Sequence, residues 1–592
     1  MHGTHAGKRH DRLRAASLAV VCLAGLAAGC TSPNDAEREV LQRSVIDAIR
    51  REMIEAERTP DYRLTDRPST VETLRIPDDR LEELNELSGP GSYEGMADLF
   101  DRDLLSEDQR AVRVSLERSI RSAAERNLNL QFQRLNPAVS EADLVQAQAA
   151  FDWTFFADGV YQFVDEPITS STFFGTAFQQ IQQGDLSTGL RRQLSTGGNV
   201  QFDMTWTYQQ NENDTIVIAP DPANFVTVGA QLTQPLLRNA GSDVALAQVR
   251  LAENTGRDTV QSLRASLIAT LFQTEQAYWN LELAADSLRI QRRLLARGEQ
   301  VRDIISNRID LDATQAQIAD ARAEVENRRA DVIRAQRTLR AASDALKVLM
   351  NDPELTIGSE IALLPADAAI DEPIRFSLAD ALTTAFDARP EVAQAIISLD
   401  SAGIQRQVAQ NGVLPRLDAN FEVRYAAIGA TPGEAFEEVW DGNFIDFVIG
   451  FAFEQPIGNR QANAALRQAQ LQQIQAVTSY QNTIQQVTLE VKDALRDVTS
   501  NYELIEQTRT ARVAAAENLR ALQVQIETTG GYTAFNLDQW LTRQQLLALA
   551  ELEEAQALVA YNIAIAQLYA AIGRSIEHNR IEFLAPDSAE LD

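Results

Sequence analysis

The sequence predicts an α+β membrane protein, in which long helical hairpins are joined to membrane-spanning β-strands. Three observations lead to this prediction. Two long stretches contain no proline, the segments between them alternate polar and apolar residues, and the N-terminus has the pattern of an export signal. The fold class also includes two internal repeats and a barrel to which several chains contribute strands, for reasons given below.

The N-terminal segment is expected to be a lipoprotein-type signal peptide covering residues 1–29. An apolar run at 15–28 follows a basic head and ends in Gly29-Cys30, where a bacterial lipoprotein signal has its lipidated cysteine. Ala27 stands where such signals usually have leucine, so an ordinary signal peptide with an incidental cysteine is the alternative. We expect a covalent lipid on Cys30 and no other cofactor.

Composition excludes several classes of function. The 592 residues include 84 Asp and Glu against 54 Lys and Arg, a net charge of −30, which argues against a nucleic-acid partner. Without residues 1–29 the charge becomes 50 − 83 = −33. Only four histidines are present, and three of them lie in the first ten residues. The rest of the chain therefore has too few histidines for histidine-based catalysis or metal binding. We therefore expect no enzyme.

Two helical hairpins are predicted from the proline-free stretches, 236–352 and 457–585. Ala, Gln, Leu, Arg and Glu dominate both, and these residues favour helices. The breaks are expected at 307–310 and 528–532, where Asn and Gly accept the left-handed conformation that ends a helix. Residues 236–306 as one helix would span on the order of 100 Å.

A coiled-coil seam can be counted in the second arm of the first hairpin. Between Ile318 and Leu349, apolar residues recur at alternating steps of three and four, and only Arg328 interrupts them. Alanine alternates with larger residues along this seam, so neighbouring helices are expected to approach closely.

An internal repeat divides the chain. Residues 115–130 match 377–392 at an offset of 262, and 228–236 match 449–457 at an offset of 221. We infer a first repeat at 111–352, a linker at 353–376, a second repeat at 377–575 and a tail at 576–592. The difference between the offsets predicts an insertion of about 41 residues in the first repeat, within 166–224.

Four segments alternate with the period of a strand: 153–163, 226–233, 416–425 and 447–454. Their apolar sides are rich in aromatic residues, as in transmembrane barrels. A soluble β-sandwich with one wet face is the alternative. Four strands cannot close a barrel, so the membrane interpretation requires several chains to pool strands. The polar side of one strand would then face the lumen: Arg416, Asp418, Asn420, Glu422 and Arg424.

The insertion contains a further alternating run at 200–209. Because each half leaves the helices and returns to them on the same side, its strand number must be even. The mate is expected at 186–193, across the turn Thr196-Gly197-Gly198. We interpret the pair as an added hairpin near the outer loops.

This layout resembles the TolC-like outer-membrane efflux proteins over about 110–575. The resemblance depends on the order and duplication of short motifs: Gln234-Pro235-Leu236-Leu237, Ala277-Tyr278-Trp279, Arg389-Pro390-Glu391, Leu414-Pro415, Gln455-Pro456-Ile457 and Leu537-Asp538. It implies a homotrimer with one 12-stranded barrel in the outer membrane and a periplasmic α-barrel tunnel. The implied partners are a periplasmic adaptor and an inner-membrane transporter.

The resemblance also implies a gate at the periplasmic ends of the helices. Asp538 matches one acidic gate position, and Asp312 occupies the equivalent place in the first half, although each could instead be a solvated or N-capping residue. Leu541 stands where a second acid is expected, and Asn307 replaces the usual glycine of the first tip. Residues 30–110 precede the family core and are interpreted as an acidic tether, with one helix at about 35–57.

The predicted function is the outer-membrane duct of a tripartite efflux system, carrying small molecules or ions without chemistry. The duct of a type I protein secretion system is a close alternative. A lipid-anchored periplasmic adaptor or scaffold belongs to a different class, and would have one helical hairpin with soluble β-domains.

Overall fold

The computed structural model describes residues 35–59, 76–89, 92, 111–168, 177–211, 219–308, 314–531 and 533–583. The chain divides into two units, Met1–Arg51 and Glu52–Asp592. Helix α2 (Asp35–Glu57) contains the boundary and agrees with the helix predicted there. All elements below belong to the second unit. No described helix has an apolar stretch long enough to cross a membrane.

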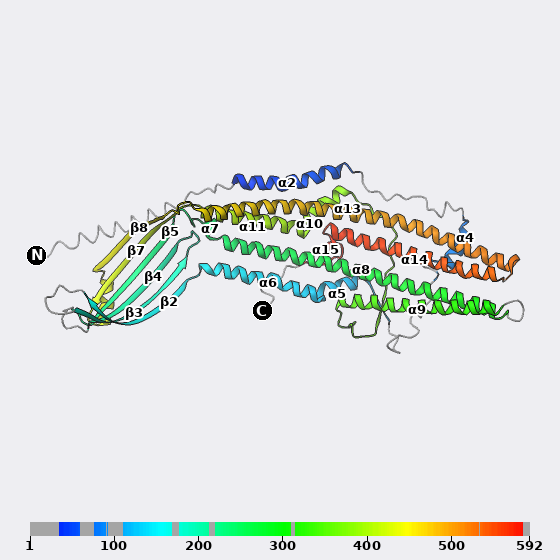
Figure 1. The fold of residues 1–592 in the computed structure, drawn as a ribbon, viewed down its shortest axis with the longest axis horizontal. Coiled ribbons are helices and arrows are strands. Elements are labelled where there is room, and N and C mark those ends of the chain that lie inside the picture. Colours follow the sequence, from blue (N-terminus) through cyan, green and yellow to red (C-terminus); the bar gives the residue numbers. More distant parts are fainter. Residues whose placement is uncertain are drawn as a thin grey trace. The chain divides into compact units, whose positions relative to one another are not determined.

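Four long helices form the two predicted hairpins (Figure 1). The first hairpin pairs α8 (Ala247–Ser306) with α9 (Gln315–Met350), and the second pairs α13 (Arg460–Gln525) with α14 (Ala534–Ala571). Helix α13 has 66 residues, which corresponds to about 100 Å. Both predicted breaks are confirmed, the second through a π-helical turn at Ile526–Gly530.

Two details of the first hairpin differ from the prediction. The helix does not begin at 236, because Asn239 and Gly241 have φ of 66° and 96°, which helical geometry excludes. A short helix α7 (Ser242–Ala245) precedes α8. Asn307 has φ of −72° and is not left-handed, whereas Gly531 in the second break has φ of 58°.

Six antiparallel strands form one sheet in the order β2-β3-β4-β5-β7-β8 (Figure 1). Their bounds are β2 Thr154–Ile168, β3 Ala177–Gln193, β4 Asn199–Asn211, β5 Ala223–Pro235, β7 Arg416–Gly429 and β8 Phe444–Glu454. Four come from the first half of the chain and two from the second, so both numbers are even as expected.

The register places every predicted apolar alternation on one face of this sheet. One row across all six strands is apolar, and consists of Phe155, Leu190, Phe202, Ala230, Val423 and Phe447. The adjacent row, on the opposite face, is polar on every strand except β8. It consists of Thr154, Arg191, Gln201, Gln231, Glu422 and Val448. The two-faced pattern read from the sequence is therefore confirmed.

The structure confirms the added hairpin, formed by β3 and β4, but its predicted place near the outer loops was wrong. Strands β3 and β4 are full-length members of the sheet, inserted between β2 and β5. Their turn lies at the helical end of the sheet, where Gly241 N–H donates to Thr196 O at 3.1 Å. A β-carbon on Gly197 would meet Asn239 O at 2.2 Å, so this close approach requires glycine.

Helix α12 (Pro432–Asp441), between β7 and β8, was not predicted. Thr431 and Glu434 form a capping box at its start, and Gly442 ends it in the left-handed conformation. Its Ala435 and Val439 pack on Val226 and Ala427 of the sheet.

The remaining helices and a two-stranded parallel sheet surround the long helices. They are α4 Asp78–Leu87, α5 Leu116–Arg126, α6 Leu128–Gln148, a 3-10 turn Ala149–Phe151, α10 Leu378–Ala388, α11 Pro390–Gly412 and α15 Ser575–His578. Strands β1 (Ala111–Val114) and β6 (Ala362–Pro365) pair in parallel and were not predicted.

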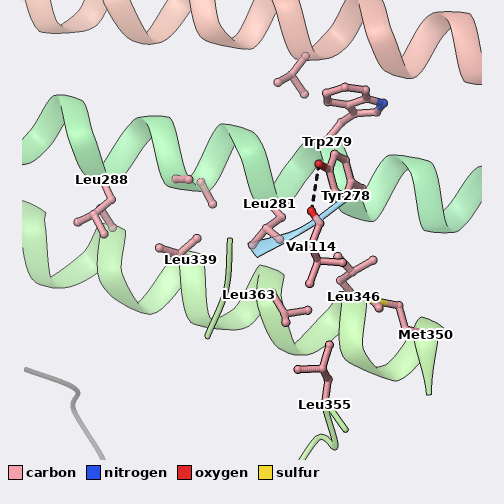
Figure 2. Packing of buried hydrophobic residues seen from close by; sticks show 14 of the residues in the cluster. Val114, Tyr278, Trp279, Leu281, Leu288, Leu339, Leu346, Met350, Leu355 and Leu363 are labelled. Carbon is pink, nitrogen blue, oxygen red and sulfur yellow. Dashed lines mark hydrogen bonds between the residues drawn. The ribbon is translucent and has the colours of Figure 1, made fainter. Parts of the chain in front are cut away.

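The buried core around β1 and β6 centres on Tyr278 of α8 (Figure 2). The fully buried Tyr278 hydroxyl donates to Asp367 Oδ2 at 2.9 Å and approaches Val114 O at 3.3 Å. It also accepts backbone N–H bonds from Ala366 and Asp367. Burial raises the pKa of this phenol, so it stays a neutral donor. One tyrosine thus joins the linker, β1 and the first hairpin.

Candidate functional site

The polar face of the sheet brings together the five residues expected to line a lumen. Arg416, Asp418, Asn420, Glu422 and Arg424 occupy alternate positions of β7 and therefore share one face. Arg416 pairs with Asp418 at 2.6 Å, and Arg424 pairs with Glu422. These pairs balance charge along the strand.

The same face continues across the inserted strands. Asp185 of β3 accepts from the Thr207 hydroxyl at 2.7 Å and from Gln183 at 2.9 Å. Ser187 and Thr205 share a hydrogen bond at 3.0 Å between their hydroxyls. Sequence reasoning did not assign these residues to the lining, although their alternation was visible. The polar surface therefore spans more than the strand that was predicted to carry it.

The opposite face is apolar and, outside the part that α12 covers at Val226 and Ala427, largely exposed in the single chain. Phe155 is 68 % exposed, Phe202 47 % and Phe447 56 %. Soluble monomers rarely expose so large an apolar surface, which must be covered by lipid or protein. Strands β2 and β8 form the two edges of the sheet as described, and neither has a second neighbour there. A sheet with these faces and edges has the features of one sector of a barrel wall.

Of the two gate candidates, Asp538 lies in the described part of the structure and Asp312 does not. Asp538 is exposed in the second turn of α14, and it does not cap the helix, because the Thr533 hydroxyl accepts from Asn536 N–H. Asp312 lies outside the described residues, as does Cys30. Leu541 packs partly buried against Val301, Ile305, Ile318, Ala321 and Leu537. The position where an acid was expected therefore belongs to the core that joins the two hairpins.

Arg328, the interruption of the predicted seam, joins three helices. Its side chain is 2 % exposed and donates to Leu294 O of α8 at 2.9 Å and to Gln544 Oε1 of α14 at 2.9 Å. Glu324, one turn earlier, accepts from its Nε at 2.9 Å. A β-carbon on Gly298 would lie 2.8 Å from Arg328 Nη1, so glycine makes room for the guanidinium. Burial lowers the pKa of this guanidinium, and Glu324 opposes that shift.

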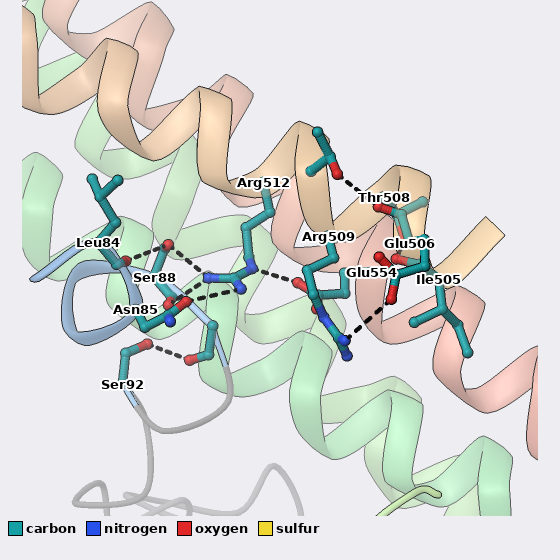
Figure 3. A network of polar contacts seen from close by, with 12 residues as sticks. Leu84, Asn85, Ser88, Ser92, Ile505, Glu506, Thr508, Arg509, Arg512 and Glu554 are labelled. Atoms are coloured by element: carbon teal, nitrogen blue, oxygen red, sulfur yellow. Dashed lines mark hydrogen bonds and ion pairs between the residues drawn. The ribbon is translucent and has the colours of Figure 1, made fainter. Parts of the chain in front are cut away.

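A second buried arginine fixes part of the acidic extension to the hairpins (Figure 3). Arg512 of α13 donates to Ser88 O at 2.8 Å and to Asn85 Oδ1 at 3.1 Å, both in or beside α4. It also pairs with Glu554 of α14. Leu84 of α4 is fully buried against Val513 and Leu547. The segment 76–89 therefore contacts both arms of the second hairpin.

The motif Arg389-Pro390-Glu391 holds helices together. Arg389 pairs with Glu391 at 2.8 Å and with Glu490 of α13 at 2.7 Å. It also donates to Ala571 O at the end of α14, at 3.2 Å. These contacts give the motif a structural role where α10 and α11 meet the second hairpin.

A two-faced sheet with open edges beside long helical hairpins is typical of membrane channels, and comparison with known proteins identifies the family. The chain belongs to the outer membrane efflux protein family, whose model matches residues 199–344 and 381–574, more than half of the chain. Members of this family are channels and not enzymes. No individually curated protein sequence matches the chain.

Solved structures show the same fold at low sequence identity. The CmeC outer membrane channel of Campylobacter jejuni has a TM-score of 0.57 at 14% identity, covering 83% of this chain and 93% of that one. The structure of CusC has a TM-score of 0.56 at 16% identity, covering 87% and 99%. The MtrE outer membrane channel of Neisseria gonorrhoeae has a TM-score of 0.54 at 18% identity, covering 78% and 89%. The suspected TolC-like resemblance is thereby confirmed.

Proposed function

We propose that the chain is the outer-membrane duct of a tripartite efflux system, working as a passive homotrimer. The observation that carries this proposal is the sheet, which has one polar face, one exposed apolar face and two open edges. Three copies joined edge to edge would close a barrel, with the apolar face on lipid and the polar face on water. The long hairpins would extend the duct into the periplasm toward an adaptor and an inner-membrane transporter.

The ends of the hairpins are the proposed gate. A threefold axis would turn Asp538, and Asp312 in the first hairpin, into rings of carboxylates that concentrate negative potential in a narrow mouth. Such rings favour cations.

Planar-bilayer recording of the purified full-length protein tests the duct. We expect small, cation-selective currents that rise when Asp312 and Asp538 are both replaced by Ala. Asp497→Ala, which removes an exposed carboxylate in the interior of α13, is the matched control and should leave selectivity unchanged. If neither the wild type nor the double variant conducts, the duct proposal is wrong.

Anchoring by a lipid on Cys30 completes the proposal, with residues 1–29 removed on export. Cys30→Ser should abolish metabolic labelling with palmitate and leave the barrel in the outer membrane, because the sheet supplies its own lipid contact. Unchanged labelling of the variant would contradict lipidation at this cysteine.

A further inference from the structure

We propose that this duct closes as an 18-stranded barrel, six strands from each of three chains. Measured at the backbone, this barrel encloses about twice the cross-section of the 12-stranded barrel expected from the sequence. The inference rests on the proposed function for the number of copies. The strand number per copy comes from the sheet itself, in which β3 and β4 lie between β2 and β5.

Pairing on both sides makes the inserted hairpin part of the wall. Strand β3 pairs with β2 from Thr154 to Ile168 and with β4 from Ile181 to Gln193, without a break in either ladder. Strand β4 in turn pairs with β5 over 11 residue pairs, from Asn199 to Gln209. A hairpin folded into the lumen or over the rim would leave β2 and β5 adjacent, and here they are separated by two strands.

The side chains of the inserted strands match a wall and not a plug. Leu186, Leu190 and Phe202 are 44, 43 and 47 % exposed, and they share a face with the exposed aromatic residues of β2 and β8. The other face of these strands carries Asp185, Ser187 and Gln201, beside the polar residues of β5 and β7. An apolar outer row and a polar inner row are what a strand between lipid and water requires.

The size of the barrel follows from strand spacing and tilt. With about 4.8 Å between strands and a tilt of about 40°, 18 strands give a backbone radius of about 18 Å and 12 strands give about 12 Å. Six strands are fewer than the eight of the smallest transmembrane barrels, and the edges of the described sheet are open. Copies of the same sheet are therefore the occupants that continue both ladders. The wider wall implies bulkier cargo than a four-strand-per-chain duct would pass.

The architecture offers a matched deletion. Because β2 is antiparallel to β3, β3 to β4 and β4 to β5, removal of 177–211 leaves β2 and β5 antiparallel to each other. The 19 residues that remain between them, 169–176 and 212–222, can then connect them. The register also keeps Phe155 and Ala230 on the same face. This variant should close with 12 strands.

Electron microscopy of the full-length protein in lipid nanodiscs tests the proposal directly. End-on views should show a ring of 18 strands for the wild type and 12 for the deletion variant. A wild-type ring of 12 strands, or a β3–β4 hairpin outside the ring, would overturn the inference and leave the duct intact. A ring of 18 strands that carries no current would instead contradict the proposed function alone.

Polymer access supplies a second readout that does not depend on the deletion variant folding. The native cysteines, Cys22 and Cys30, lie in the first 30 residues, so Gln231→Cys adds one thiol on the polar face of β5. Maleimide-polyethylene glycols of graded size, applied from outside intact cells, should reach this thiol up to a size that a 12-stranded lumen excludes. Ala230→Cys, on the apolar face, is the control and should not react. A cutoff no larger than a 12-stranded lumen admits would overturn the inference.

Discussion

The helical hairpins and the six-stranded sheet differ in how their apolar and polar groups find partners. In the hairpins, buried polar groups such as Tyr278, Arg328 and Arg512 find hydrogen-bond partners within one chain. In the sheet, residues such as Phe155 and Phe451 remain 68 % exposed and both edges are open. Contacts within one chain therefore stabilise the hairpins, whereas the sheet would need lipid and further copies to cover its apolar face and its edges.

The largest effect is expected on the stability of the helical hairpins. Arg328→Ala removes a buried guanidinium and leaves Leu294 O and Gln544 without their donor, so we expect a loss of about 3–5 kcal/mol in the free energy of unfolding. Loss of helical signal with temperature, followed by circular dichroism at 222 nm, measures it. Arg329→Ala, one residue away in an exposed pair with Glu326, is the control and should cost less than about 1 kcal/mol. Equal losses of unfolding free energy in the two variants would show that the buried contacts of Arg328 add no more stability than an exposed ion pair.

The second largest effect is expected on the assembly of the six-stranded sheet into a barrel. Phe202→Lys places a charge on the apolar face and should destabilise the assembled barrel by about 2–4 kcal/mol, because a cation facing lipid is poorly solvated. Gln201→Lys places the same charge one residue away on the polar face and should be tolerated. The amount of heat-resistant oligomer in the outer-membrane fraction distinguishes them. If both variants assemble equally, the assignment of the two faces is wrong.

A smaller and local effect is expected where α4 contacts the hairpins. Arg512→Ala removes the donor to Ser88 O and Asn85, while Glu554 keeps its pair with Arg509 at 3.0 Å. Residues 76–89 should therefore exchange amide hydrogens faster and be cut sooner by protease. Arg520→Ala breaks only the exposed pair with Glu83 and should have a much weaker effect. Unchanged exchange in the Arg512 variant would mean that Leu84 alone holds α4 in place.

The smallest effect is a pH dependence of the helical region. Burial, and then repulsion from Asp286, raise the pKa of Glu282 to about 7, and Arg289 opposes the shift. The folded state therefore binds this proton more tightly than the unfolded state, so this group adds stability as pH falls from about 7 toward 4.5. Glu282→Gln should raise Tm at pH 8 more than at pH 5. Glu253→Gln, which changes an exposed residue of α8, should not show this difference.

The sequence predicted what depends on periodicity and could not predict what depends on distant contacts. Strand faces and helix breaks follow from local alternation and from residues such as Gly531, and they were found. The β1–β6 pair could not be found, because four-residue strands separated by about 250 residues carry no periodic signal. The capping box of α12, Thr431 with Glu434, was a local signal that could have revealed that helix.

The shared polar face of β7 was predicted, whereas the contacts of the buried arginines were not. Arg416 to Arg424 alternate with apolar residues, so a shared face could be read directly. Arg328 showed only as a defect in the seam. Its role depends on Gly298 and Gln544, which are 30 and 216 positions away and become neighbours only in the folded chain.

The turn beside Gly197 has a consequence for how such channels diversify. A duplication that adds one hairpin there returns the chain to its starting side, and leaves the frame and direction of every later helix unchanged. In a threefold assembly that single genetic event adds six strands at once. The bore of such an assembly would therefore change in steps of six strands.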